Sequence, residues 1–129
     1  MHFQVINDSF YNRILEKIYE YFPSFNSVFD KEDGVYPILG ELGTFITENF
    51  HQENIRIPAI NFITEAIEQG GSETEDAIVL QVFQKFYEDV GLTNEIKMLL
   101  GNRALSVFDK YLIEYNRLVA LVFIEFRRN

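Results

Sequence analysis

The sequence predicts an all-α protein of five to six antiparallel helices, in a compact bundle or a short stack of helical hairpins. Apolar residues recur at helical spacing along almost the whole chain, and glycine or proline separates successive stripes. No segment shows a convincing strand pattern. The chain has 129 residues, of which 47% are hydrophobic, so we expect a single helical domain over residues 1–129 with a core of its own.

The first helix is indicated by an apolar stripe that follows Asp8 and Ser9, either of which suits an N-cap. The stripe comprises Phe10, Ile14, Ile18 and Tyr21. Pro23 disfavours helical geometry at the residue before it, so the helix should end there. We expect a short helical turn within residues 24–29 and a loop over residues 30–34.

Two longer helices are expected in the middle of the chain. Pro37 suits the first turn of one, where its missing N–H costs nothing. Its apolar face should comprise Ile38, Leu42, Phe45 and Ile46. The next helix is expected over about 53–69. Pro58 fits only a first turn, which favours a start nearer Ile57.

The strongest local signal is a capping box, in which Ser72 and Glu75 follow two glycines and precede an apolar run. The helix that it opens should stop at Gly91. Thr93 should cap a short helix that ends at Gly101. Asn102 should cap the last helix, whose inward residues are expected to be Leu105, Phe108, Leu112 and Tyr115.

The closing sequence LVALVFIEFRRN, residues 118–129, begins with seven consecutive apolar residues. Its Val, Ile and Phe favour strands, but no glycine or proline separates it from the preceding pattern, which favours one long helix. The run is shorter than the ~20 residues that a membrane span needs. A helix apolar nearly all round is buried or shared with a second chain. We expect packing against the same chain, or otherwise a homodimer, through Leu118, Leu121, Val122, Phe123 and Phe126.

The acidic residues are concentrated in one part of the sequence. The net charge is −9, and residues 30–84 contain eleven acids and two bases. A one-signed surface can steer a cationic protein partner, and it repels nucleic acid. The simpler interpretation is a solvated face that maintains solubility. We expect a basic partner to contact Glu65, Glu68, Glu73, Glu75 and Asp76.

The sequence offers little that points to catalysis or to a bound cofactor. It has no cysteine, which excludes disulfides and thiolate chemistry and fits a reducing cytoplasm. The N-terminus does not resemble a secretory signal. His2 and His51 lack metal-ligand spacing, and the acid pairs have no histidine partner. We therefore expect a cytoplasmic protein that is not an enzyme and binds no metal, cofactor, nucleic acid or membrane.

Five segments follow one another along the chain: FPSF, GVYPILGELGTFITENF, IPAINFITEAIEQ, SETEDAIVLQVFQKFYEDVG and EIKMLLGNRALSVFD. In this order they resemble a set of small, acidic, all-helical bacterial proteins of unassigned function. The similarity covers roughly residues 22–117. It implies an immunity-like or antitoxin-like partner of a bacterial toxin, or a small helical-repeat adaptor. No catalytic residue is carried over. The leading hypothesis is thus an immunity-like protein that masks a basic partner, and the alternative is an adaptor that dimerises through its C-terminal helix.

Overall fold

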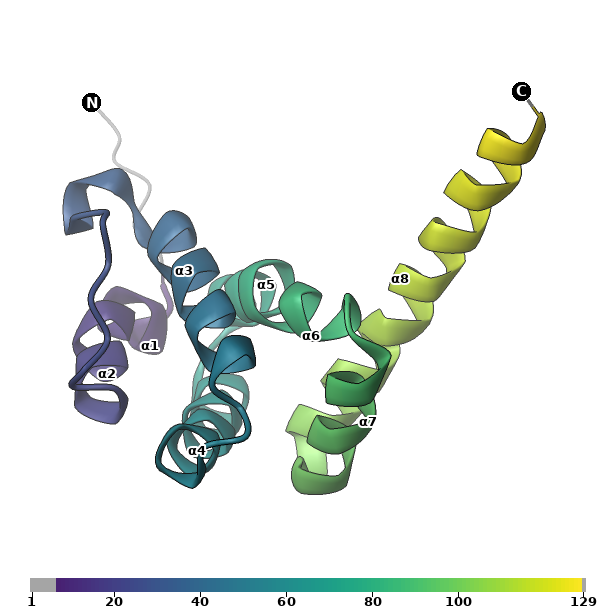
Figure 1. Ribbon diagram of the computed structural model, residues 1–129. Coiled ribbons are helices and arrows are strands. Elements are labelled where there is room, and N and C mark those ends of the chain that lie inside the picture. Colours follow the sequence, from purple (N-terminus) through teal and green to yellow (C-terminus); the bar gives the residue numbers. More distant parts are fainter. Residues whose placement is uncertain (1–6, 129) are drawn as a thin grey trace, which may run out of the picture.

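The computed structural model describes residues 7–128 and shows an all-helical protein, as predicted, with 81% helix and no strand in that range (Figure 1). His2 lies outside the described residues. The elements in chain order are α1 (Ser9–Asn12), α2 (Ile14–Tyr21), η1 (Lys31–Asp33), α3 (Val35–Glu48), α4 (Glu53–Gln69), α5 (Ser72–Ile78), η2 (Val79–Phe83), α6 (Gln84–Tyr87), α7 (Val90–Leu99) and α8 (Asn102–Arg128).

The N-terminal helices cover one end of the molecule. The expected first helix is divided at Arg13, which has a non-helical φ of −113°, so that α1 and α2 follow each other at an angle. Helix α2 ends at Tyr21, close to the stop predicted from Pro23. The expected helical turn within 24–29 is absent, and a 3₁₀ turn forms at η1, where we expected only a loop.

Helices α3 and α4 form the centre of the fold. Pro37 lies in the first turn of α3, as predicted. Helix α4 has the expected bounds, but the later start near Ile57 is wrong, because Pro58 lies inside the helix at its sixth position. A proline there removes the N–H that would have bonded the carbonyl of Asn54, and its ring crowds that carbonyl. The N-terminal part of α4 accommodates that loss on a partly exposed side, where Ile57 is 49% exposed.

The core is rich in phenylalanine, and its rings contact one another edge to face. Phe22 lies 5.9 Å from Phe62, and Phe83 lies 5.0 Å from Phe108, each between ring centroids. Each such pair contributes about 0.5–1.5 kcal/mol beyond simple burial. Gly43 lets α3 approach η2 closely, because a Cβ there would lie 2.6 Å from a backbone oxygen of η2. These contacts fix the helix that runs from α5 to α6 across the middle of the body.

Helices α5, η2 and α6 form one continuous rod from Ser72 to Tyr87, and η2 is a π-helical segment within it. The predicted capping box is wrong, because Ser72 is already the first helical residue and Gly71 holds the N-cap position without a side-chain bond. The cap comes instead from Asp8, far away in the sequence. Its Oδ2 accepts bonds from Gly71 N, Thr74 N and Thr74 Oγ1, each at 2.9 Å.

The predicted boundaries around α7 are also wrong. The rod ends at Tyr87 rather than at Gly91, which is the second residue of α7. Asp89, not Thr93, caps α7 by accepting a bond from Leu92 N at 3.1 Å. Thr93 is buried and donates its hydroxyl to the carbonyl of Phe86 at 2.7 Å. An Asp three residues before an N–H is as good a cap as Thr.

Helix α8 is one unbroken helix of 27 residues, which confirms the continuous helix preferred over a strand. Asn102, which was expected to cap this helix, is its first residue. Its first half packs on the body through Ala104, Val107 and Phe108. Its second half projects away from the body and ends far from the other helices (Figure 1).

Candidate functional site: an apolar groove beside helix α8

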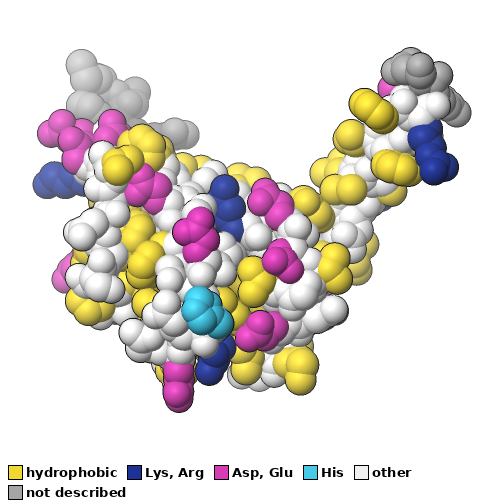
Figure 2. All heavy atoms as spheres, viewed as in Figure 1, with side chains coloured by type: hydrophobic (Ala, Val, Ile, Leu, Met, Phe, Trp, Pro, Cys, Tyr) yellow, Lys and Arg dark blue, Asp and Glu magenta, His cyan; other side chains and the backbone are white. Residues whose placement is uncertain are grey.

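The projecting half of α8 exposes an unusual amount of apolar surface. Phe126 is 82% exposed, Phe123 58% and Val122 69%, and Leu118, Val119, Leu121 and Ile124 are exposed as well. Apolar side chains follow this helix almost to its end in the space-filling view (Figure 2). Single exposed apolar residues are ordinary, whereas a contiguous patch marks a contact surface.

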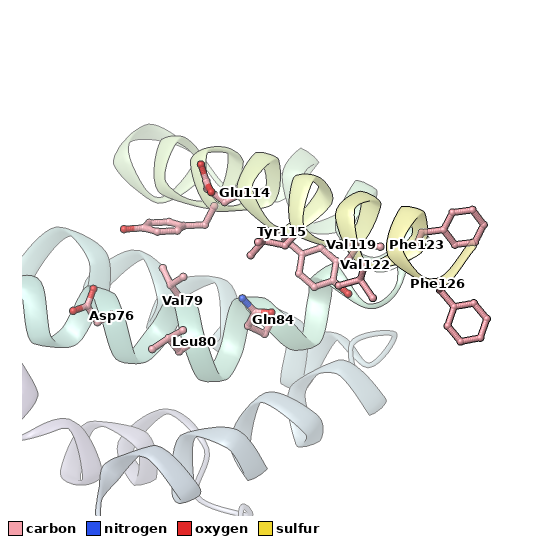
Figure 3. Close-up of a pocket in the computed structure, with 12 residues that line it drawn as sticks. Asp76, Val79, Leu80, Gln84, Glu114, Tyr115, Val119, Val122, Phe123 and Phe126 are labelled. Carbon is pink, nitrogen blue, oxygen red and sulfur yellow. The ribbon is translucent and has the colours of Figure 1, made fainter. Parts of the chain in front are cut away.

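One side of this helix faces a groove that the rod from α5 to α6 closes on its other side. The rod contributes Asp76, Val79, Leu80 and Gln84. Helix α8 contributes Tyr111, Glu114, Tyr115 and five further residues, which we call the groove face of α8: Leu118, Val119, Val122, Phe123 and Phe126. The groove has a volume of about 1090 Å³. Figure 3 shows the rod and α8 side by side, with Asp76 near one end and Phe126 near the other.

The π-helical segment η2 lies in the middle of the groove wall. Val79 is buried in the wall, while the side chain of Leu80 is 52% exposed toward the groove side. One extra residue in a helical turn rotates all following side chains relative to those before it, and such segments are frequent at functional sites. In this segment Val82 and Phe83 lie in the core and Leu80 lies at the surface.

Charge is distributed unevenly along the groove. Asp76 and Glu114 lie toward the end that contains Tyr111, and Arg127 follows the opposite end. The guanidinium of Arg127 lies 4.9 Å from the ring centre of Phe123, a cation–π contact that holds it beside the groove face. Glu114 is engaged with Arg117 at 2.8 Å, whereas Asp76 is exposed and forms no ion pair with any described residue. The groove is thus apolar along its length, acidic at one end and basic at the other.

The expected packing of the C-terminal segment against its own chain is wrong. All five residues predicted to dock are more than half exposed, because α8 continues straight past the last helix that could cover it. Four of them, Leu118, Val122, Phe123 and Phe126, lie on the groove face. Leu121 is not among the groove-lining residues. Around the helix axis it lies about 60° from Leu118, in the direction opposite to Val122. The alternative expectation, docking on a second chain, stays open.

Two of the five acids predicted to bind a basic partner already have partners within the chain, and three are exposed. Glu65 faces α2, where it accepts bonds from Lys17 Nζ at 3.1 Å and Tyr21 Oη at 2.6 Å. Glu75 faces the start of α8 and pairs with Arg103 at 2.6 Å. Glu68, Glu73 and Asp76 are exposed. On the face in Figure 2, acidic side chains are separated by neutral, apolar and basic ones. Binding of a basic partner by the three exposed acids stays a prediction.

The contact between Glu65 and Tyr21 shows that at least one of these acids has a structural role. The hydrogen bond from Tyr21 is the main cause that lowers the pKa of Glu65, with the bond from Lys17 acting in the same direction. Burial, and then the bond to Glu65, raise the pKa of Tyr21 to about 12. Both groups therefore keep their neutral-pH charge states, and the bond ties α2 to α4.

Metal binding and membrane crossing find no support within residues 7–128. No cluster of three or more histidine and acidic side chains is placed to hold a metal ion there. His51 lies in the exposed turn between α3 and α4. None of the described helices combines the length and the apolar character that a membrane span requires.

Sequence reasoning missed two contributors to the groove. Leu80 was not singled out, and nothing in the sequence indicates the π-helical turn in which it lies. Val119 was not among the residues expected to dock, although it belongs to the groove face. A signal was available, because Tyr111, Tyr115, Leu118, Val122 and Phe126 follow each other at spacings of three and four residues, the pattern of one helix face.

Comparisons of this chain with known protein families, with curated proteins and with solved structures found no match. The resemblance to small acidic bacterial proteins accordingly stays a prediction.

Proposed function

We propose that this protein is a non-enzymatic, self-associating structural or adaptor protein that uses the groove face of α8 as its contact surface. The observation that carries this proposal is the projection of an apolar half-helix beyond the body, with Phe126 82% exposed. A helix in water that exposes this face gains free energy when the face is covered.

The gain can be compared with the cost of association. A phenylalanine side chain buries roughly 200 Å² when fully covered. At the exposures of Phe123 and Phe126, 58% and 82%, covering both removes about 280 Å² of apolar surface per chain. At about 25 cal/mol per Å² this is about 7 kcal/mol per chain, as an upper estimate. Two chains gain about 14 kcal/mol, against an association cost of about 4–15 kcal/mol. Leu118, Val119 and Val122 add to that gain.

Sedimentation equilibrium tests the proposal with a matched pair of variants. Leu118 and Leu121 are exposed to nearly the same extent, 56% and 53%, but only Leu118 lies on the groove face. Wild-type protein should show a mass near twice 15.2 kDa. Leu118→Ser should shift the equilibrium toward the single chain, whereas Leu121→Ser should have a much smaller effect. A wild-type mass of 15.2 kDa at every accessible concentration would contradict the proposal.

A second candidate function is the binding of a basic protein partner, as an immunity-like protein would do. It is favoured by the net charge of −9 and by the exposure of Glu68 and Glu73 near the junction of α4 and α5. A lysine-rich peptide should then bind at low salt, and the double variant Glu68→Lys/Glu73→Lys should remove that binding. Equal binding by this variant and by the wild type would argue against a specific acidic site.

A further inference from the structure

We infer that the occupant of the groove is helix α8 of a second copy of this chain, which lies antiparallel to the first α8 in a two-fold symmetric dimer. This inference rests on the proposed self-association and adds the partner segment, its direction and its register. The same groove face would then act twice, since each copy supplies both a groove and the helix that fills the other groove. Such reciprocity is characteristic of a two-fold interface.

The shape of the site fits a helix. The groove is open along one side of α8 and has an apolar wall on the rod, formed by Val79 and Leu80 (Figure 3). Its lining residues on α8 run from Tyr111 to Phe126. That length of helix spans about 22 Å. The projecting half of α8 is itself a helix of suitable length with an apolar face on the same side.

The charges determine the direction. Asp76 lies at the end of the groove near Tyr111, where Glu114 is already paired with Arg117, and Arg127 lies at the other end. An antiparallel arrangement brings Arg127 of each copy to the acidic end of the other groove. A parallel arrangement would place the two Arg127 side chains together and leave the acids facing acids, which is unfavourable. Antiparallel α8 helices also align their dipoles favourably.

The extent of the groove face determines the register. An antiparallel pair covers every lining residue from Tyr111 to Phe126 only if the two-fold axis passes near the midpoint of that range, which is between Leu118 and Val119. Residue 119 of one copy then lies close to residue 119 of the other. Phe126 lies close to Tyr111 of the second copy, about 22 Å from the second Phe126.

Disulfide trapping tests direction and register, because the natural chain has no cysteine and each introduced one reports alone. A disulfide needs Cα atoms within about 7 Å. On mild oxidation, Val119→Cys should link to itself, and a mixture of Phe126→Cys with Tyr111→Cys should link to each other. Phe126→Cys by itself should stay unlinked. Leu121→Cys, outside the groove face of α8, is the control and should stay unlinked as well.

Charge exchange tests the ends of the groove independently. Arg127→Asp and Asp76→Arg should each weaken the homodimer about tenfold, because each change places like charges together at both ends. When the two variants are mixed, both ends of the heterodimer regain opposite charges, so heterodimer formation should return to near the wild-type affinity. Recovery in the mixture is not expected from a variant that merely unfolds.

The outcomes separate this inference from the proposed function. If the wild type is a dimer but Phe126→Cys links to itself, the antiparallel direction is overturned and self-association stays in place. If Val119→Cys stays unlinked in that dimer, the register is overturned. Failure of the mixed charge variants to recover also overturns the antiparallel direction. A wild-type protein that sediments only as a single chain overturns both.

Discussion

Asp8 is expected to be the most important single polar residue for stability, because one carboxylate caps two helices. Its Oδ1 accepts a bond from Tyr11 N at 3.1 Å at the start of α1. Its Oδ2 accepts three bonds at the start of α5, from Gly71 and Thr74. The side chain is only 6% exposed. Its loss would therefore leave several buried donors without acceptors.

The magnitude follows from these bonds. Removal of an N-cap costs about 1 kcal/mol, and a buried donor left without a partner costs a further 1–3 kcal/mol, roughly. With two caps and the buried hydroxyl of Thr74 affected, we expect Asp8→Ala to lower the free energy of unfolding by about 3–4 kcal/mol. That is a large fraction of the roughly 5–15 kcal/mol that stabilises a domain. Asp8→Asn keeps one acceptor oxygen and should cost less, about 1–2 kcal/mol.

The carboxylate also makes stability depend on pH. Burial is the largest influence and raises the pKa of Asp8, but the bonds from Thr74, Tyr11 and Gly71 together outweigh it, so the pKa lies below its ordinary value of 3.8. The unfolded chain consequently binds the proton at a higher pH than the folded chain does. The stabilisation is complete above about pH 3.8 and is lost as the pH falls through the lower, folded-state pKa.

Urea denaturation followed by far-ultraviolet circular dichroism at pH 7 and near pH 3 measures both effects. The difference in unfolding free energy between wild type and Asp8→Asn should be large at pH 7 and smaller at low pH, because the variant has no charge to lose at this position. A loss below about 0.5 kcal/mol for Asp8→Ala at pH 7 would refute the capping argument. So would a difference between wild type and Asp8→Asn that does not change with pH.

Three further substitutions test the packing, each by urea denaturation. Gly43→Ala should lower the unfolding free energy by about 2 kcal/mol, since its Cβ would lie 2.6 Å from the backbone of η2. As the control, Gly40→Ala places a Cβ 2.9 Å from only the flexible end of a side chain and should be nearly neutral. Equal losses in the two variants would contradict the close approach of α3 to η2. Tyr87→Phe should cost about 1 kcal/mol, because its buried hydroxyl donates to an α8 carbonyl at 2.8 Å; an unchanged midpoint would show that this bond adds nothing. Pro58→Ala should raise the unfolding free energy by about 1 kcal/mol by restoring a helix N–H, and a decrease would mean that the proline ring is needed for packing.

Helix positions could be predicted from the sequence where local and tertiary preferences agree. Helix α3 has the expected apolar face, since Ile38, Leu42 and Ile46 are buried and Phe45 is half-buried. Helix α4 has the expected bounds. The boundaries failed where a cap comes from elsewhere in the chain. Ser72 and Glu75 match a capping box locally, yet Asp8 occupies the position that Ser72 would have filled. A residue separated by 66 positions cannot be assigned to a cap from a pattern of four residues.

The residues of the candidate site could be predicted in part, but the surface that they pack against could not. The reason is the direction of α8. The sequence identified the apolar C-terminal residues but expected them to pack on their own chain, as most apolar residues do. Residues 102–129 contain no glycine or proline, so nothing allows the helix to turn back. A straight helix of 27 residues spans about 40 Å, which exceeds the roughly 30 Å width of a small domain. Because its first half is fixed on the body by Val107 and Phe108, its second half must extend past the edge. The apolar pattern therefore predicts that these residues need a cover, while helix length and the absence of a turn predict that the cover belongs to another chain.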